Sequence, residues 1–355
     1  MSSCVVVGAG MAGLTAAGIM RSRSCKVTIL DKGRGVGGRM ATRRIGASRF
    51  DHGAQFFTVR DARFREAVEN WERAGLVAPW FSEDGHVRYR AIGGMNALAK
   101  HLAEPLQVRT ETKVERVEPA WQVILESGET LQADTLLLTP PAPQSAGLVS
   151  SWIDCSGIEF DPCFALLAVL DGPSLVPEPG YMRPESGPIE WLADNTRKGV
   201  SQGRPAITIH TRADFTREYF DAPQDLVAQL LFEAAKAWIG SAPAVWQLHR
   251  WRYSKPLPVN LPPCLFTAGP APLAVAGDAF AGGRVEGAFL SGLAAAEELL
   301  KGSGRWCAGP GENAAIAACP WLSPFLHRFT ENGPKGNREA HFAVRALPAR
   351  PSRSS

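Results

Sequence analysis

Residues 4–17 read CVVVGAGMAGLTAA, and residues 26–31 read KVTILD. The first segment is a short apolar run, followed by three glycines with the spacing G-x-G-x-x-G and by an alanine-rich stretch. This pattern predicts a strand, a tight turn and a helix. The second segment predicts another strand, and it ends in an acidic residue. A strand, turn, helix and strand in this order are typical of a dinucleotide site.

Each residue type in this segment has a physical role. Gly8 allows the turn after the strand, Gly10 lets the backbone approach a pyrophosphate, and Gly13 lets the helix pack closely on the sheet. The helix is expected to begin near Met11, so that its unpaired N–H groups face the phosphates. Asp31 follows the last glycine by 18 residues, and an acid there favours the unphosphorylated ribose of FAD or NAD. A glycine turn with a solvated Asp31 is the alternative.

Length and composition limit the possible functions. The chain has 355 residues, enough for two domains that share a ligand cleft, and its 45% hydrophobic and 21% charged residues are typical of a soluble globular protein. The net charge of +3 is too small to indicate a nucleic acid or a membrane surface as partner. No apolar run approaches the ~20 residues of a membrane-spanning helix.

The N-terminus and the cysteines predict a cytoplasmic protein. The apolar N-terminal run has no basic segment before it, so no signal peptide is expected. The seven cysteines are scattered and form no C-x-x-C pair, which indicates reduced thiols and neither zinc nor a disulfide framework. No metal site is predicted.

A loop rich in glycine and arginine is predicted at residues 32–44, directly after the acid. Glycines allow close approach to a ligand, and the guanidinium groups of Arg34 and Arg39 can neutralise phosphate. A solvated basic loop is the alternative. The next segment, residues 50–57, mixes polar and aromatic groups, and its His52 is more often hydrogen-bonded to its surroundings than catalytic.

The first half of the chain also contains packing elements. Helical spacing predicts two buried helix faces, formed by Phe64, Val68 and Trp71 and by Leu98 and Leu102. β-forming residues predict a small antiparallel meander at 107–117, 121–125 and 130–133, and a strand buried on both faces at 135–138. The prolines at 140–143 indicate a crossing between domains.

Residues 151–255 indicate a second, α+β substrate domain built on a mixed sheet. Strands are predicted at 163–170, 189–193 and 206–211. An amphipathic helix follows at 224–239, and its predicted buried face contains Leu226, Leu230 and Ala234. The run after it, residues 245–256, is dense in aromatic and cationic groups.

Near the other end of the chain, an apolar strand followed by Gly277-Asp278, a glycine loop and a helix through Leu300 repeat the logic of the opening segment. We therefore predict an α/β fold with a discontinuous Rossmann-type domain, formed by residues 1–60, 92–145 and 262–302. Residues 61–91 and 146–261 are assigned to the substrate domain. Residues 303–355 are a C-terminal extension that is predicted to be partly disordered.

Two sets of motifs resemble the flavin amine oxidase superfamily and, within it, a bacterial renalase-like branch. The resemblance to the superfamily rests on the first glycine motif with Asp31 and on residues 37–39, 51–54, 94–95 and 277–278. The resemblance to the branch rests on residues 38–44, 50–56, 249–253 and 283–288. It covers about residues 3–302. It implies a two-domain fold in which the Rossmann-type domain binds FAD. No motif in the sequence indicates covalent attachment, so non-covalent FAD is expected.

The renalase-like resemblance also implies an activity. Such enzymes oxidise dihydro isomers of NAD(P)H, reduced at the 2 or 6 position of the nicotinamide ring, to NAD(P)+, and O2 reoxidises the flavin with formation of H2O2. A dihydronicotinamide dinucleotide and O2 are then the small-molecule partners. Hydride transfer requires the donor carbon to be held against flavin N5, so positioning dominates and no strong base is needed. The sequence contains no nucleophile–base–orienter set, and no catalytic side chain is assigned with certainty.

Roles for individual residues follow from the resemblance. We expect the three glycines to hold the pyrophosphate, Asp31 to bind the adenosine ribose, Arg34 or Arg39 to lie near phosphate, Asp278 to bind the ribityl or phosphate side, and the backbone at 285–287 to face the flavin pyrimidine. The expected cofactor-binding residues are Gly8, Gly10, Met11, Ala12, Gly13, Asp31, Lys32, Arg34, Gly38, Arg39, Met40, His52, Gly53, Ala54, Gln55, Gly277, Asp278, Val285, Glu286 and Gly287.

The substrate site is expected at the run 249–253. His249, Trp251 and Tyr253 face the cleft if this run forms a strand whose alternate residues point to one side. An aromatic core with surface arginines is the alternative.

Three rival functions stay open. A flavin amine oxidase commonly has a lysine near flavin N5, for which Lys255 is the candidate, although Pro256 after it favours a loop. An NAD-dependent dehydrogenase explains the opening motif but not Gly277-Asp278. An FAD-binding protein without catalysis is the third. The oligomeric state is not predicted.

Overall fold

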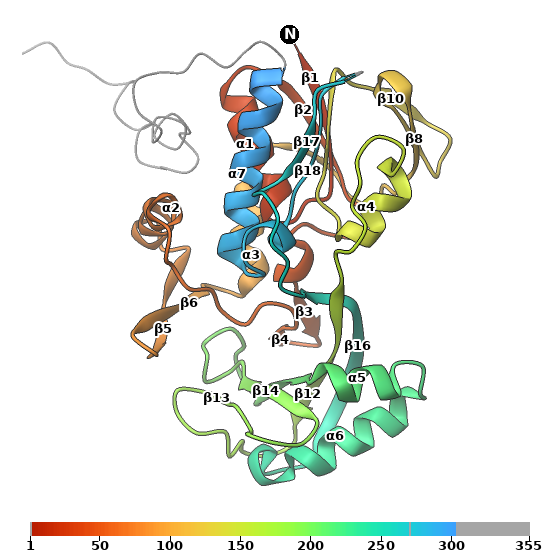
Figure 1. The fold of residues 1–355 in the computed structure, drawn as a ribbon. Helices are drawn as coiled ribbons and strands as arrows, with labels where there is room; N and C mark the ends of the chain where they lie inside the picture. The colour runs from red at the N-terminus through yellow and green to blue at the C-terminus, as the bar shows by residue number, and fades with distance from the viewer. Residues whose placement is uncertain (1, 270, 303–355) are drawn as a thin grey trace, which may run out of the picture.

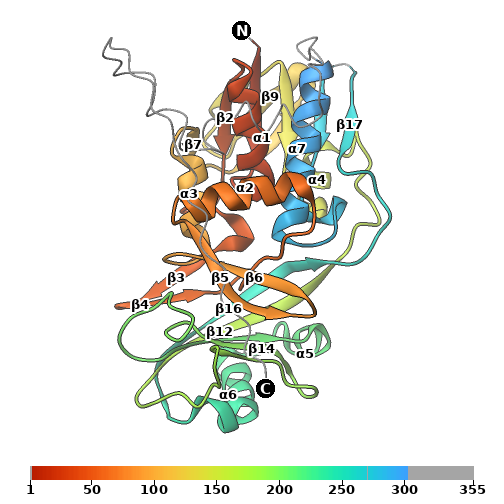
Figure 2. The same ribbon diagram turned by 90° about the vertical axis from the view of Figure 1, so that its left-hand side faces the viewer.

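The computed structural model describes residues 2–269 and 271–302, so the predicted extension 303–355 lies outside the described residues. Two sheets organise the molecule, a larger one in the upper part and a smaller one in the lower part of both views (Figure 1, Figure 2). Within the described ranges, no helix combines the length and the apolar character needed to cross a bilayer.

The larger sheet has six strands in the order β17-β18-β11-β1-β2-β7. Neighbours pair in parallel, except for the antiparallel pair β17–β18. The first strand, β1, and β18, the last strand of the described residues, share this sheet, so the Rossmann-type domain is discontinuous as predicted. The strands are β1 (Ser3–Val7), β2 (Lys26–Leu30), β7 (Gln107–Arg109), β11 (Thr135–Leu138), β17 (Leu265–Thr267) and β18 (Leu273–Val275).

Both faces of this sheet are covered. Alternate residues point to opposite faces of a strand, so Val6 and Ile29 lie in one core while Val5, Val7 and Leu30 lie in the other. The central strands therefore read as continuous apolar runs in the sequence. One face is covered by helices (Figure 1), namely α1 (Met11–Ser22), α3 (Met95–Ala103) and α7 (Val285–Gly302).

The opposite face carries an antiparallel meander and helix α4 (Ala142–Val149). The meander contains β8 (Val114–Glu118), β9 (Gln122–Leu125) and β10 (Thr130–Gln132). The prediction that the meander begins at residue 107 is wrong, because Gln107–Arg109 pairs in parallel with β2 in the larger sheet. Such a three-residue strand carries no sequence signal that distinguishes its partners.

Helix α2 (Ala62–Arg73) precedes the hairpin of β5 (Val77–Glu83) and β6 (His86–Ala91). The predicted buried faces of α2 and α3 are confirmed. In α2, the rings of Phe64 and Trp71 contact Phe289 of α7. This packing favours counting α2 with the Rossmann-type domain, and the limits of the two domains otherwise stay a prediction.

The smaller sheet has the order β13-β14-β15-β12-β16. Its strands are β12 (Phe160–Leu170), β13 (Tyr181–Met182), β14 (Ile189–Asp194), β15 (Ala206–Thr211) and β16 (Pro243–Pro256). All its pairings are antiparallel, so the mixed sheet expected for this part of the chain is corrected to an antiparallel one. Helices α5 (Ala213–Tyr219) and α6 (Gln224–Ile239) pack on it (Figure 1).

The extent of α6 is confirmed, but its predicted buried face is wrong. Val227, Leu231 and Ala235 are buried, whereas Leu226 is 42% exposed. Two adjacent apolar stripes run along this helix, and the sequence spacing alone does not decide which one meets the sheet.

Two segments connect the larger sheet with the smaller one. Hairpin β3 (Thr42–Ile45) and β4 (Ser48–Asp51) lies between the two sheets, and the long strand β16 runs from the smaller sheet towards the larger one (Figure 1). Lys255 lies in β16, so the expectation that it is a loop residue is wrong. Strand β16 continues to Pro256 because it pairs with the first residues of β12, where Phe160 is opposite Pro256.

Candidate functional site

A cavity of about 1130 Å³ lies at the carboxyl ends of β1 and β2, where Val7 and Leu30 line it. Residues of the smaller sheet, among them His210 and Trp251, line its other side. Open α/β sheets bind their ligands at the carboxyl ends of the strands. A single ligand pocket usually measures ~300–1,000 Å³, so this cavity exceeds the usual size of a pocket for one small ligand.

The glycine turn has the geometry that its spacing predicts. Gly8 has a φ of +100°, which a residue with a side chain rarely adopts. A Cβ at Gly13 would lie 2.1 Å from the carbonyl oxygen of Gly8, whereas a Cβ at Gly10 would meet nothing within 4 Å. Helix α1 begins at Met11 without a side-chain cap, so its first N–H groups are left for a ligand.

Asp31 is held by the backbone at the edge of this turn. Its Oδ2 accepts a hydrogen bond of 2.7 Å from the N–H of Ala9, and its Oδ1 accepts one of 2.7 Å from the N–H of Gly33. Each carboxylate oxygen has a second lone pair, so two further donors can still bind. The carboxylate is therefore pre-positioned to accept bonds from ribose hydroxyls.

Most of the cofactor-binding residues predicted from the sequence line the cavity. They are Gly8, Gly10, Met11, Ala12, Asp31, Lys32, Gly38, Arg39, Met40, His52, Gly53, Ala54, Gln55, Gly277, Asp278 and Val285. The candidate substrate residues His249, Trp251 and Tyr253 line it as well, on β16.

Four predicted cofactor residues do not line the cavity. Gly13 packs under the turn, and Arg34 is exposed on the loop. The carboxylate of Glu286 accepts the N–H groups of residues 60 and 61, at 2.6 and 2.8 Å, and so holds the start of α2. A Cβ at Gly287 would lie 2.3 Å from the carbonyl oxygen of Ala281. Glu286 and Gly287 therefore serve packing, while Val285 and Ala288 face the cavity.

Arg39 and Asp278 form a bidentate ion pair across the cavity. The two Nη atoms of Arg39 donate to the two carboxylate oxygens of Asp278, at 2.8 and 2.6 Å. Arg39 lies in the short helix η1 (Gly38–Met40) and Asp278 in η3 (Asp278–Phe280). The sequence predicted separate contacts of these residues with phosphate and with the ribityl side. In the structure the two side chains bind each other, and the ion pair joins the two glycine loops.

Residues 52–55 form one wall of the cavity. A Cβ at Gly53 would lie 1.9 Å from the carbonyl oxygen of Arg39, and the N–H of Ala54 donates to that oxygen at 2.8 Å. The wall is thus pressed against the Arg39 loop. Two of its buried polar atoms, Nδ1 of His52 and Oε1 of Gln55, have no hydrogen-bond partner among the described residues. Buried polar groups need partners, so these atoms are fitted for a polar ligand.

Three histidines and a tryptophan form a cluster on this wall. The ring of His52 stacks on Trp251 with centroids 5.4 Å apart and meets His249 edge-on at 5.1 Å. The carbonyl oxygen of His52 accepts the indole N–H of Trp251 at 2.8 Å and lies 3.0 Å from Nε2 of His210. These contacts fix the rings that the cavity exposes to a ligand.

The imidazoles of this cluster are neutral at neutral pH. Burial lowers the pKa of His52 to about 3, and His249 and Arg43 add to the effect. Burial also lowers the pKa of His210 to about 4, although the hydrogen bond to the carbonyl of His52 acts against it. Burial, followed by the charge of Arg43, lowers the pKa of His249 to about 4. Each ring therefore offers one N–H donor and one acceptor.

The charged side chains of the cavity are mostly basic. Eight lysine and arginine residues line it against four acids, a surplus of four positive charges. The basic residues are Lys32, Arg39, Lys113, Arg183, Arg250, Arg252, Lys255 and Arg284, and the acids are Asp31, Asp161, Glu190 and Asp278. The cavity is therefore suited to anionic ligands.

Comparison with known proteins gives the family. A model of NAD(P)-binding Rossmann-like domains matches residues 6–71, and a model of flavin containing amine oxidoreductases matches residues 72–300, more than half of the chain. The chain belongs to the flavin containing amine oxidoreductase family. It is an oxidoreductase that binds FAD.

Individual relatives of this family member are distant in sequence. Renalase of Mus musculus is 24% identical over 292 residues, covering 72% of this chain and 85% of the relative. Wild-type putrescine oxidase bound to putrescine superposes with a TM-score of 0.62 at 13% identity, over 84% of this chain and 99% of that one. An oxidoreductase from Methanosarcina mazei gives a TM-score of 0.58 at 13% identity, over 82% and 99%. These two structures show that the fold is shared.

The residues present fit FAD. The open space at Gly10 and the uncapped start of α1 suit the pyrophosphate, and the carboxylate of Asp31 suits the ribose. The unpartnered atoms of His52 and Gln55 suit the polar edge of a flavin ring. The flavoprotein would therefore hold its cofactor along the larger sheet, from the glycine turn to the wall at 52–55.

Several residues of the cavity were not predicted from the sequence. His210 is a single histidine in β15, whose other residues are alanine, isoleucine and threonine. Glu190 and Trp191 lie in β14, another strand of the smaller sheet. Only the strand order brings them to the cavity, and no local pattern marks them. Arg252 and Arg284 lie within motifs that the sequence singled out, so their basic charge was the available signal.

Proposed function

We propose that this flavoprotein removes hydride from dihydro isomers of NAD(P)H, reduced at the 2 or 6 position, and releases NAD(P)+. The bound flavin would supply the hydride acceptor, and its reoxidation by O2, which gives H2O2, would allow the next turnover. The proposal is supported by the sequence resemblance to renalase and by the charge of the cavity.

The positive charge of the cavity is the observation that carries the proposal. Lys113 and Arg183 pair with Glu126 and Glu83 outside the lining, as Asp161 does with Arg217, so six cations and three acids remain, a surplus of three. A pyrophosphate has one negative charge per phosphate, so FAD offsets about two of these charges. The remaining positive charge favours a second ligand with phosphates. A dihydronicotinamide dinucleotide has such a group.

A cationic amine is the alternative substrate, and the acids of the cavity are poorly placed for it. Asp278 pairs with Arg39, and Asp161 pairs with Arg217. Glu190 is the one lining carboxylate for which the described residues give neither an ion pair nor a hydrogen bond to the backbone. The cavity thus lacks the negative charge that would attract a small amine.

Neutral aromatic rings suit the loss of hydride from a dihydronicotinamide. The ring becomes positively charged as hydride leaves, so protonated histidines beside it would oppose the reaction. His52, His210 and His249 stay neutral because burial lowers their pKa values. The indole of Trp251 is fixed by its hydrogen bond to His52 and can offer its face to the developing cation. These side chains position the substrate and exclude water, and no general base is required.

If the protein were an amine oxidase, Lys255 would be the candidate for the lysine near flavin N5. It lines the cavity and is exposed at the end of β16. The buried Lys198 does not line the cavity and pairs with Asp51. Neither position argues for an amine oxidase more than for the proposed reaction.

A cytoplasmic location is also part of the proposal. The five cysteines in the described ranges are free thiols, at positions 4, 25, 155, 163 and 264. This agrees with a reducing compartment.

Anaerobic mixing tests the proposed substrate. The purified holoenzyme is mixed with 2- and 6-dihydro-NAD, with their 2′-phosphorylated forms and with putrescine, and flavin absorbance is followed. We expect rapid bleaching by at least one dihydro isomer and none by putrescine. Bleaching by putrescine alone would overturn the proposal in favour of an amine oxidase. Bleaching by neither class would also overturn it.

A further inference from the structure

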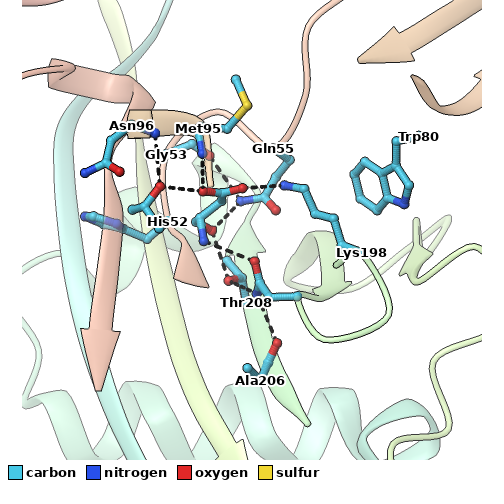
Figure 3. A network of polar contacts seen from close by, with 12 residues as sticks. His52, Gly53, Gln55, Trp80, Met95, Asn96, Lys198, Ala206 and Thr208 are labelled. Carbon is cyan, nitrogen blue, oxygen red and sulfur yellow. Dashed lines mark hydrogen bonds and ion pairs between the residues drawn. The ribbon is translucent and has the colours of Figure 1, made fainter. Parts of the chain in front are cut away.

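A buried ion pair joins the smaller sheet to the wall of the FAD cavity. Nζ of Lys198 lies 2.7 Å from Oδ2 of Asp51, and both side chains are 0% exposed. Lys198 belongs to the segment between β14 and β15, whereas Asp51 ends β4 and directly precedes the wall at 52–55. The ring of Trp80 covers the ammonium group at 4.9 Å. Figure 3 shows Lys198 with the ring of Trp80 beside it and the network of polar contacts that its ammonium group joins.

Every polar atom of Asp51 is engaged. Its Oδ1 accepts the hydroxyl of Thr42 at 2.6 Å and the N–H of Met95, the first residue of α3, at 2.7 Å. Its own N–H donates to Oδ1 of Asn195 at 3.0 Å. The side chain of Asp51 thus connects β3, α3 and the segment between β14 and β15 at a single point.

The carbonyl groups of residues 51 and 52 carry this fixation into the cavity. The carbonyl oxygen of Asp51 accepts the hydroxyl of Thr208 at 3.0 Å and Nε2 of Gln55 at 2.6 Å. The next carbonyl, of His52, accepts Trp251 at 2.8 Å. Gln55 and His52 are the residues whose unpartnered atoms are available to a ligand.

A buried pair of this kind is not explained by stability alone. Taking both charges out of water costs free energy, and apolar residues of similar volume often stabilise a protein as well or better. What the pair provides here is a fixed geometry, because it ties the end of β4 to the segment between β14 and β15 and its hydrogen bonds end at the cavity wall.

We propose that Asp51 and Lys198 are positioning residues for the flavin: they lock the wall at 52–55 to the smaller sheet and so set the environment of the bound cofactor. Neither residue lines the cavity, so they act through His52 and Gln55. The proposal depends on FAD binding and not on the identity of the substrate. It is therefore tested without any substrate.

The experiment compares the wild type with the double variant Asp51→Asn/Lys198→Met, which removes both charges and leaves no buried charge unpaired. The readouts are the FAD dissociation constant of the apoprotein, the visible circular dichroism of the bound flavin and the thermal unfolding of the apoprotein. Ser201→Ala is the matched control, because it removes a 3.0 Å bond to the N–H of Arg49 between the same two parts and leaves Asp51 untouched.

We expect the double variant to unfold cooperatively near the wild-type temperature, to bind FAD at least about ten-fold more weakly, and to change the flavin dichroism. The control should match the wild type in FAD affinity and flavin dichroism, and only its unfolding temperature should fall slightly, because the N–H of Arg49 loses its partner. Wild-type affinity and dichroism in the double variant would show a merely structural pair and overturn the proposal.

A milder variant keeps the test decisive if the double variant does not fold. Thr208→Val removes the hydroxyl that donates to the carbonyl of Asp51, and Thr208→Ser restores a hydroxyl. The valine variant should shift the flavin dichroism and weaken FAD binding, and the serine variant should recover both. Wild-type values in the valine variant would overturn the proposal.

Discussion

Acidification below about pH 6.5 is expected to destabilise the protein through His52 and His210. Burial lowers their pKa values to about 3 and about 4, whereas an unfolded histidine has a pKa of ~6.5. Below about pH 6.5 the unfolded chain takes up protons that the folded chain does not bind, so the free energy of unfolding decreases as the pH is lowered. Above about pH 7 both states are neutral at these positions, and they contribute no pH dependence.

The magnitude follows from this difference. At about pH 5.5 an unfolded histidine is about 90% protonated, so the two residues account for an uptake of about 1.8 protons and a slope of about 2.5 kcal/mol per pH unit. Between about pH 6.5 and 5.0 the accumulated loss is about 3 kcal/mol, against a usual total stability of about 5–15 kcal/mol. His249 is more exposed and acts in the same direction.

Urea unfolding of the holoenzyme at a fixed excess of FAD, monitored by tryptophan fluorescence between about pH 7.5 and 5.0, measures this slope. The variant His210→Asn serves as the internal comparison. Its absolute stability is lower, and its slope near pH 5.5 should be smaller than that of the wild type by about 1.2 kcal/mol per pH unit, the share of one histidine. A flat stability profile below pH 6.5, or an unchanged slope in the variant, would refute the neutral state of these imidazoles.

Three further predictions test the turn, the ion pair and the basic lining. Gly13→Ala should prevent stable folding, because the added Cβ would lie 2.1 Å from a carbonyl oxygen. Gly10→Ala should fold but bind FAD more weakly, because its added Cβ would meet nothing within 4 Å in the protein. Thermal unfolding and FAD titration distinguish the two variants, and equal behaviour would contradict the geometry. Lys198→Met should lower the free energy of unfolding by about 3–5 kcal/mol by leaving a buried carboxylate unpaired, and adding Asp51→Asn should recover most of it in urea unfolding; no recovery would argue against the pair. Arg284→Gln should raise KM about ten-fold for a dihydro dinucleotide and less for the dihydronicotinamide mononucleotide, as steady-state kinetics will show; equal effects would place Arg284 away from the second phosphate.

The dinucleotide half of the site could be predicted from the sequence because its determinants are local. The turn at Gly8 and Gly10, the acid at Asp31 and the strands around them lie within some thirty residues, and backbone geometry dictates each residue type. The buried faces of α2 and α3 follow from helical spacing in the same way.

The contacts that complete the site are long-range, and the sequence pattern does not contain them. Arg39 and Asp278 are separated by 239 positions, and Lys198 and Asp51 by 147. Each of these charged residues, taken alone, would be expected on the surface, and only the fold brings the two members of each pair together. The charge of Arg39 predicts a phosphate nearby, but nothing near it in the sequence indicates that Asp278 is its partner.

The distribution of charge within the cavity, and not only the net charge, supports a dinucleotide ligand. Arg252, Lys255 and Arg284 are exposed, so the basic groups lie where solvent reaches the cavity. His52 is 5% exposed, and burial keeps its imidazole uncharged. A dihydronicotinamide dinucleotide has the matching polarity, since its phosphates need cations while its ring becomes positive as it is oxidised. An amine substrate would require the reverse, negative charge near the entrance, and the cavity offers only Glu190 for that purpose within the described ranges.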